Sequence, residues 1–160
     1  MPSDRAPQPS ARHRARAYAL QGLYQWILTA ESAAGIVGYL RQHPEYRKAD
    51  EDHFLALLHG CMREAAHLRQ HLAPCLDRRV AELSPVEHAI LLIGVYEYLH
   101  HAEIPYRVVI NEAVELAKAF GGTDGYKYVN GVLDKLAARL RADEQHAAPA
   151  PASPAPLPAG

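Results

Sequence analysis

The placement of proline constrains this chain more than any other feature of its sequence. Eight of the twelve prolines fall within the first nine or the last twelve residues, and only Pro44, Pro74, Pro85 and Pro105 lie between them. A proline removes a backbone donor and breaks the interior of a helix. The long stretch between the two ends is therefore free to form helices, and apolar residues recur along it at helical spacing.

This spacing predicts an all-α fold of about seven helices. The expected helices span about 12–30, 33–43, 52–72, 76–83, a segment that begins after Ser84, 106–120 and 125–140. The clearest start signal is Ser84-Pro85-Val86-Glu87, which combines a capping serine, a first-turn proline and a glutamate at the third helical position. The residues that follow are apolar on nearly every side, which is typical of a buried central helix. Tyr24 and Phe120 belong to apolar stripes that we expect to face the core.

The ends of the chain differ in composition from its middle. We expect residues 1–11 to be a disordered basic arm, residues 12–141 a helical domain, and residues 142–160 a disordered tail rich in proline and alanine. The longest apolar run, Ala89 to Tyr96, is far shorter than the ~20 residues that a membrane helix needs. The chain begins without the apolar stretch of a signal peptide and has two lone cysteines, so we expect a cytoplasmic protein without membrane contact.

The formal net charge of −1 conceals an uneven distribution. Residues 1–16 contain four arginines and one aspartate, a local charge of +3 on an acidic remainder. Any anion-binding surface is therefore expected to be small and local, because dedicated nucleic-acid binders are strongly basic. A group of basic residues stands at the start of a predicted helix, where positive charge opposes the helix dipole. This arginine cluster consists of Arg12, His13, Arg14 and Arg16. We interpret the cluster as an anion-binding element.

The last predicted helix offers a second polar surface. Lys127, Tyr128 and Asn130 lie off its apolar stripe. This combination suits single-stranded RNA, because a ring can stack on a base, an amide can read a base edge and an ammonium can contact a phosphate. Tyr106-Arg107 provides a similar pair of an aromatic and a cation at the start of the preceding helix.

Two Glu-x-x-His motifs, Glu64–His67 and Glu97–His100, leave an enzyme alternative open. Paired motifs of this kind, with a glutamate from each of two further helices, hold the metals of di-iron carboxylate bundles. The remaining glutamates are poorly placed for this role, since Glu112 and Glu115 lie on a polar helix face and Glu31 lies at a helix end. We therefore expect no metal, no cofactor and no catalytic residue, with the di-iron enzyme as a weaker alternative.

Two continuous blocks lie near the C-terminal end of the predicted helical domain. The first block is PYRVVINEAVELAK at residues 105–118. The second contains Phe120-Gly121, then Asp124, then KYVNGVLDK at residues 127–135. Both blocks resemble the signature of the NusB family of bacterial transcription antitermination factors. The segment from Arg12 to Trp26 resembles the start of the same family, as do Leu83, Val86-Glu87 and Tyr96-Glu97. The similarity extends over about residues 12–141.

The resemblance implies two packed helical subdomains, the first formed by the first three helices. It also implies binding to the single-stranded boxA element of ribosomal RNA leader transcripts, and a heterodimer with the ribosomal protein NusE. The pair would join other Nus factors on RNA polymerase and suppress premature termination, without catalysis. Because a similar domain forms part of an rRNA cytosine methyltransferase, a detached domain of that kind is a second alternative.

The resemblance also implies which residues act. The expected RNA-binding residues are Arg12, His13, Arg14, Arg16, Tyr106, Asp124, Lys127, Tyr128 and Asn130. The arginines would contact phosphates, with His13 at a position where an arginine is common, and Tyr128 would stack on a base. Asp124 falls at a position tied to RNA affinity, which its charge would limit. Glu87 matches an acidic residue that faces the basic ribosomal partner.

Overall fold

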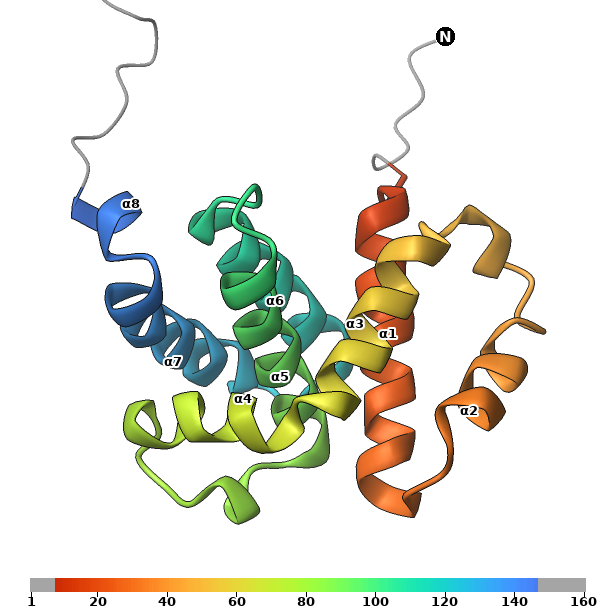
Figure 1. Cartoon of the computed structure of the whole chain (residues 1–160), viewed down its shortest axis with the longest axis horizontal. Coiled ribbons are helices and arrows are strands. Elements are labelled where there is room, and N and C mark those ends of the chain that lie inside the picture. The colour runs from red at the N-terminus through yellow and green to blue at the C-terminus, as the bar shows by residue number, and fades with distance from the viewer. Residues whose placement is uncertain (1–7, 147–160) are drawn as a thin grey trace, which may run out of the picture.

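The computed structural model describes residues 8–146, and that part of the chain is helical and contains no strand. The expected all-α fold of two packed subdomains is confirmed (Figure 1). The first subdomain contains α1 (Ala11–Thr29), α2 (Ala33–Leu40), the 3-10 turn η1 (Tyr46–Lys48) and α3 (Glu51–Arg63). The second contains α4 (Ala65–Leu72), α5 (Pro85–His100), α6 (Tyr106–Phe120), α7 (Gly125–Leu140) and the short α8 (Ala142–His146).

Helix α5 is the central element, as its sequence predicts. The Ser84 hydroxyl accepts a hydrogen bond from the backbone N–H of Glu87 at 3.2 Å, and Pro85 is the first helical residue. Every residue from His88 to Tyr98 is buried. Helix α5 packs against α1 and α3 of the first subdomain and against α4, α6 and α7 of the second. The two subdomains therefore share one core.

The predicted helix over 52–72 is wrong as a single element, because the chain breaks at Glu64 into α3 and α4. Gly60 of α3 lies against the Tyr96 ring so closely that an added Cβ would be 2.3 Å from it. After the break α4 also packs against α5, and the Glu64 carboxylate lies 2.8 Å from His100 Nε2. The break thus lets one stretch of sequence serve both subdomains, and neither proline nor glycine marks its position.

The helix expected over 76–83 is also wrong. The segment consists of the loop 76–79 and the 3-10 turn η3 (Val80–Glu82), and it follows an earlier 3-10 turn, η2 (Ala73–Cys75). Leu76 and Arg79 have extended backbone conformations, which no α-helix can include. The Arg78 side chain of this loop contacts Tyr128 of α7.

The structure describes part of the two segments that flank the expected helical domain. Helix α8 lies at the start of the segment that we expected to be a disordered tail, and its Glu144 carboxylate accepts a hydrogen bond from the Tyr106 N–H at 3.1 Å. Residues 1–7 of the expected arm and 147–160 of the expected tail lie outside the described residues.

A buried ionic cluster joins the subdomains near the start of α1. Arg16 Nε donates to both carboxylate oxygens of Glu97, at 3.1 and 3.0 Å, and His53 Nε2 lies 2.7 Å from Glu97 Oε2. The three residues are 3%, 1% and 3% exposed, and they come from α1, α5 and α3. Because a buried charge without a partner costs several kcal/mol, each member of the cluster requires the others.

A second polar contact links α4, α5 and α1. Arg69 Nε donates to His88 Nε2 at 3.1 Å, and the Arg69 guanidinium lies 5.7 Å from the centroid of the Trp26 ring. Burial, followed by the charge of Arg69, lowers the pKa of His88 to about 4. The imidazole is therefore neutral at neutral pH and can accept this hydrogen bond.

The ionic cluster gives a prediction for stability. The Arg16→Ala substitution leaves the Glu97 charge buried without its guanidinium, and we expect it to lower the free energy of unfolding by about 3–5 kcal/mol. Urea denaturation followed by circular dichroism measures the change. Arg12→Ala is the matched control, because it removes an exposed pair from the same helix and should cost less than about 1 kcal/mol. Equal losses in the two variants would contradict the structural role of Arg16.

Candidate nucleic-acid interface

The arginine cluster occupies the first turns of α1. Ser10 is the N-cap of this helix, and its hydroxyl accepts a hydrogen bond from the His13 N–H at 3.0 Å. Arg12 Nε lies 3.3 Å from an Asp50 carboxylate oxygen, and Arg14 Nη1 lies 3.0 Å from Glu45. The hydrogen bond from the His53 backbone, and then the Arg12 guanidinium, lower the pKa of Asp50. The basic side chains at this surface are therefore already paired with carboxylates.

Arg16 has a different role from the one expected. Its guanidinium is buried against Glu97, so it belongs to the core and not to a surface that RNA can contact. Its position was readable in the sequence, because Arg16 stands four residues before Leu20 on the buried face of α1. His13 remains half-buried at the surface, with its Nδ1 2.6 Å from a Glu112 carboxylate oxygen.

The pairing of the surface cations affects how they can bind an anion. Exposed ion pairs contribute only about 0–1 kcal/mol to stability, so a phosphate can replace such a carboxylate at small cost. The side chains of Arg12 and Asp50 are 46% and 32% exposed and fit this description. Each phosphate contact must nevertheless displace an existing partner, and its net contribution to affinity is smaller than that of a free arginine.

The start of α7 presents the second group of expected residues. Lys127 and Asn130 are exposed, as expected, whereas Tyr128 is half-buried and packs against the core. The Arg78 guanidinium lies over the Tyr128 ring, 4.1 Å from its centroid. Burial is also the largest cause of the raised pKa of Tyr128. The freely exposed ring that we expected here is thus covered by a cation.

Asp124 and Glu87 both lie near the first residue of α7. Asp124 occupies the N-cap position, but its carboxylate makes no capping hydrogen bond and lies 3.4 Å from Lys127 Nζ. Glu87 comes from the start of α5, and its Oε1 would lie 3.1 Å from a Cβ added to Gly125. The residue expected to face the protein partner therefore adjoins the residues expected to face RNA.

Tyr106 lies apart from the α7 group. It is buried at the start of α6, where its N–H donates to Glu144 of α8 and the Arg107 guanidinium lies 5.3 Å from its ring centroid. The arginine cluster is also separate, because Arg16 meets α5 near its C-terminal end whereas Gly125 lies beside its N-terminal end. The structure therefore distributes the expected RNA-binding residues over several surfaces.

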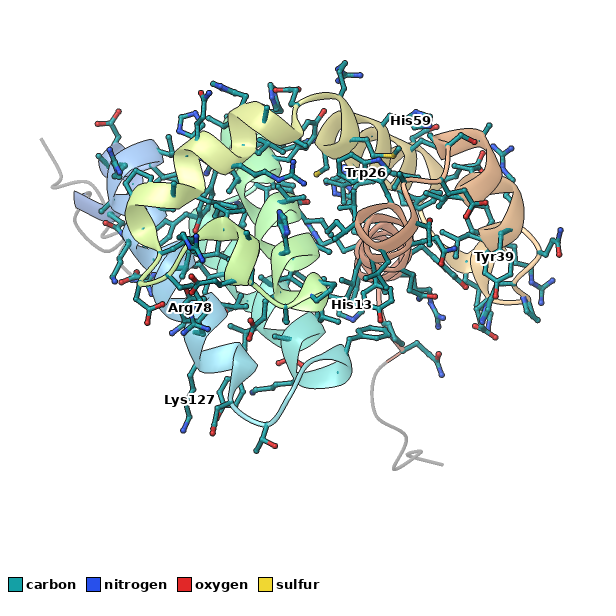
Figure 2. The ribbon with its side chains drawn as sticks, turned by 90° about the horizontal axis from the view of Figure 1, so that it is seen from below. His13, Trp26, Tyr39, His59, Arg78 and Lys127 are labelled. Carbon is teal, nitrogen blue, oxygen red and sulfur yellow. The ribbon has the colours of Figure 1, made fainter. Side chains whose placement is uncertain are left out.

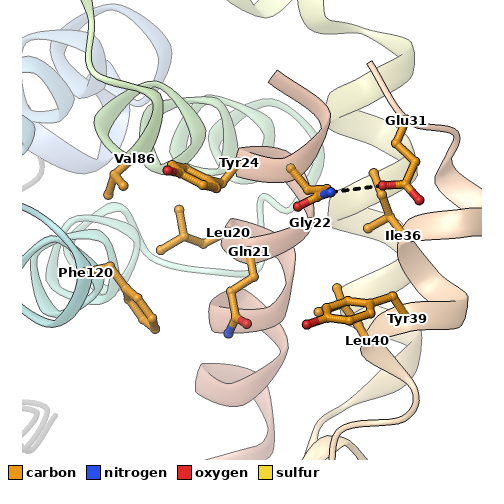
Figure 3. Close-up of a pocket in the computed structure, with 11 residues that line it drawn as sticks. Leu20, Gln21, Gly22, Tyr24, Glu31, Ile36, Tyr39, Leu40, Val86 and Phe120 are labelled. Carbon is orange, nitrogen blue, oxygen red and sulfur yellow. Dashed lines mark hydrogen bonds between the residues drawn. The ribbon is translucent and has the colours of Figure 1, made fainter. Parts of the chain in front are cut away.

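An open groove of about 740 Å³ crosses α1 (Figure 3). Helix α2 borders it on one side, and the start of α5 and the end of α6 border it on the other. Its apolar lining includes Leu20, Tyr24, Ile36, Tyr39, Val86 and Phe120. Tyr24 and Phe120 were expected to face the core, but they remain 39% and 45% exposed. At the rim, the Glu31 carboxylate accepts a hydrogen bond from Gln25 at 3.1 Å.

The glutamates of the two Glu-x-x-His motifs have other partners. Glu97 binds Arg16 and His53 in the core, and Glu64 lies beside His100. Within residues 8–146, no group of three or more histidine, cysteine, aspartate or glutamate side chains is arranged to hold a metal ion. The same residues include no helix that is both long and apolar enough to span a membrane.

Sequence reasoning missed Arg78 and the groove. Arg78 is fifty residues from Tyr128 and lies in a segment expected to be helical, so no local pattern indicates their contact. The groove depends on where α2 packs relative to α1, which periodicity does not determine.

Comparison with known proteins identifies relatives along nearly the whole helical region. Residues 13–138 match the sequence profile of the NusB family. The chain is 60% identical over 139 residues to the transcription antitermination protein NusB of Paraburkholderia phymatum, covering 87% of this chain and 96% of that protein. It is 57% identical over 149 residues to the protein of the same name from Bordetella pertussis, covering 91% and 97% respectively.

Two solved structures share the fold. NusB of T. maritima matches with a TM-score of 0.70 at 29% identity, covering 82% of this chain and 92% of that one. A crystal structure of the antitermination factors NusB and NusE in complex with double-stranded RNA matches with a TM-score of 0.66 at 26% identity, covering 79% and 95%. From the profile and the relatives together, the chain belongs to the NusB family.

Proposed function

We propose that this chain is a transcription antitermination factor that binds the boxA element of ribosomal RNA leader transcripts together with the ribosomal protein NusE. The pair joins other Nus factors on RNA polymerase in the cytoplasm and suppresses premature termination. The chain acts by binding and catalyses no reaction. Membership of the NusB family is the observation that carries this proposal.

The relatives favour this function over the two alternatives. The chain covers 96% and 97% of two relatives that are named as antitermination proteins, which supports a factor of that kind over a detached methyltransferase domain. The di-iron enzyme receives no support from the geometry, because the Glu97 carboxylate of the second motif is taken up by Arg16 and His53.

The charge distribution supports joint binding with a partner. The start of α1 presents three basic side chains at the surface, those of Arg12, His13 and Arg14. Each of them already has a carboxylate neighbour. Affinity for RNA grows with the number of phosphates that a protein neutralises. A basic partner bound to this chain adds such contacts on the same complex and raises the effective concentration of each surface.

The groove is the proposed docking site of NusE. Its apolar lining continues at Val86 to the neighbouring Glu87, and Glu31 stands at its rim. An apolar centre with acidic residues at its edge fits a basic protein, because charge complementarity guides association while the buried centre provides affinity. In this arrangement the partner lies next to the α7 surface that we assign to RNA.

Joint binding predicts a specific change in RNA affinity. Fluorescence anisotropy with a labelled single strand carrying boxA should show affinity that is several-fold higher with NusE than without it. In both cases the affinity should fall as salt rises, because phosphate contacts release counterions.

The controls for this measurement are a scrambled strand and a boxA duplex, since the related complex contains double-stranded RNA. Equal affinity for boxA with and without NusE contradicts the proposal.

The groove predicts which apolar side chain supports the partner. Phe120→Ala removes an exposed ring from the groove, and we expect it to weaken NusE binding about tenfold or more, as truncation of a central aromatic does. Val108→Ala is the matched control, because Val108 is 40% exposed on the same helix but does not line the groove. Isothermal titration calorimetry that finds the same loss in both variants argues against the docking site.

Glu87 predicts an electrostatic contribution to the same interface. Glu87→Gln removes the charge and preserves the start of α5, because the Ser84 cap uses the backbone N–H of residue 87. We expect association with NusE to slow a few-fold at low salt, and the difference to shrink as salt rises. Association kinetics followed by biolayer interferometry test this, and a rate unchanged at every salt concentration removes Glu87 from the interface.

A further inference from the structure

Arg78 is held across the surface of α7 that we assign to RNA. It belongs to the loop 76–79 between η2 and η3, and its guanidinium lies 4.1 Å from the centroid of the Tyr128 ring. Figure 2 shows Arg78 and Lys127 at the same edge of the molecule. A cation at this distance from an aromatic face is attracted to the ring. The contact brings together two residues from distant parts of the sequence.

The neighbouring aspartate fixes the orientation of this guanidinium. Arg78 Nε donates to Asp77 Oδ1 at 2.7 Å, and Nη2 donates to Oδ2 at 3.4 Å. Two parallel hydrogen bonds of this kind restrain the guanidinium plane. The Arg78 side chain nevertheless remains 38% exposed, so part of the group still faces solvent.

The position of Tyr128 changes what this surface can offer to a base. Tyr128 is half-buried and packs against the core, and Arg78 lies over its ring. A base that approaches α7 therefore meets the guanidinium before the tyrosine. An arginine plane is itself a stacking surface for unpaired RNA bases, and it also carries a charge for the phosphate.

We propose that Arg78 is the principal RNA-binding group of this surface, with its guanidinium stacking on an unpaired base and the Tyr128 ring supporting it from beneath. This inference rests on the proposed function. Lys127 stands one residue before Tyr128, is 67% exposed, and supplies a cation for the adjoining phosphate. Asn130 is exposed on the same helix and offers an amide to a base edge.

The next residue along the chain provides a matched control. Arg79 is 84% exposed, and its Nε donates to Glu82 at 2.8 Å. Arg78→Ala and Arg79→Ala thus remove the same charge from neighbouring positions, but only Arg78 lies over Tyr128. Both side chains are on the surface, and thermal unfolding of each variant verifies that the fold is retained.

The test measures the affinity of single-stranded boxA RNA for the complex of this chain with NusE, by fluorescence anisotropy. Arg78→Ala should weaken binding about tenfold, within the range for loss of one stacked base. Arg79→Ala should change it less than about twofold, as expected for one exposed charge. Arg78→Lys retains the charge without the plane and should lose most of the same affinity.

The possible results distinguish failure of this inference from failure of the proposed function. If the unaltered complex does not bind boxA RNA, the proposed function and the inference both fail. If it binds but Arg78→Ala and Arg79→Ala are equally affected, only the inference is overturned. Full affinity of Arg78→Lys also overturns it, because charge alone would then account for the role of Arg78.

Discussion

The buried carboxylate of Glu97 is the interaction on which the arrangement of this molecule depends. It receives Arg16 from α1 and His53 from α3, so three helices from both subdomains meet at one charge. Glu112 of α6 extends the cluster to the surface, where it lies 3.8 Å from Arg16 and 2.6 Å from His13. The cluster fixes the start of α1 to the end of α5. The groove lies further along α1 and α5, between α2 and the start of α5, so the cluster also fixes its position. The core charge thereby positions both the arginine cluster and the proposed docking site.

The surface combines weak elements instead of one strong basic patch. The exposed Arg12 and the half-buried Arg14 at the start of α1 are paired with Asp50 and Glu45, and Lys127 is paired with Asp124. The exposed pairs of Arg12 and Lys127 are inexpensive to exchange for phosphate, but all three pairs limit the affinity of this chain alone. A net charge of −1 fits a protein that gains much of its RNA affinity from a basic partner. The apolar groove and Glu87 provide the corresponding surface for that partner.

The sequence predicted the structural features that depend on neighbouring residues, such as the start of α5. The order Ser84-Pro85 placed the start of α5 correctly, and its continuous apolar character predicted its burial. The break at Glu64 was missed because it results from the crossing of α3 over α5, where Gly60 touches Tyr96. Arg16 was assigned to the surface by its charge, although its place in the apolar stripe indicated burial. The contact of Arg78 with the Tyr128 ring joins residues fifty positions apart, so predicting it required the tertiary structure.

The central claim is that this chain binds RNA as one half of a complex with NusE. Measuring how the chain, NusE and RNA assemble tests this claim most directly. Size-exclusion chromatography with light scattering measures the mass of the chain alone, with NusE, and with NusE and boxA RNA. We expect a heterodimer with NusE and a ternary complex of one copy of each component. Elution of the chain separately from NusE, both with and without RNA, would contradict it.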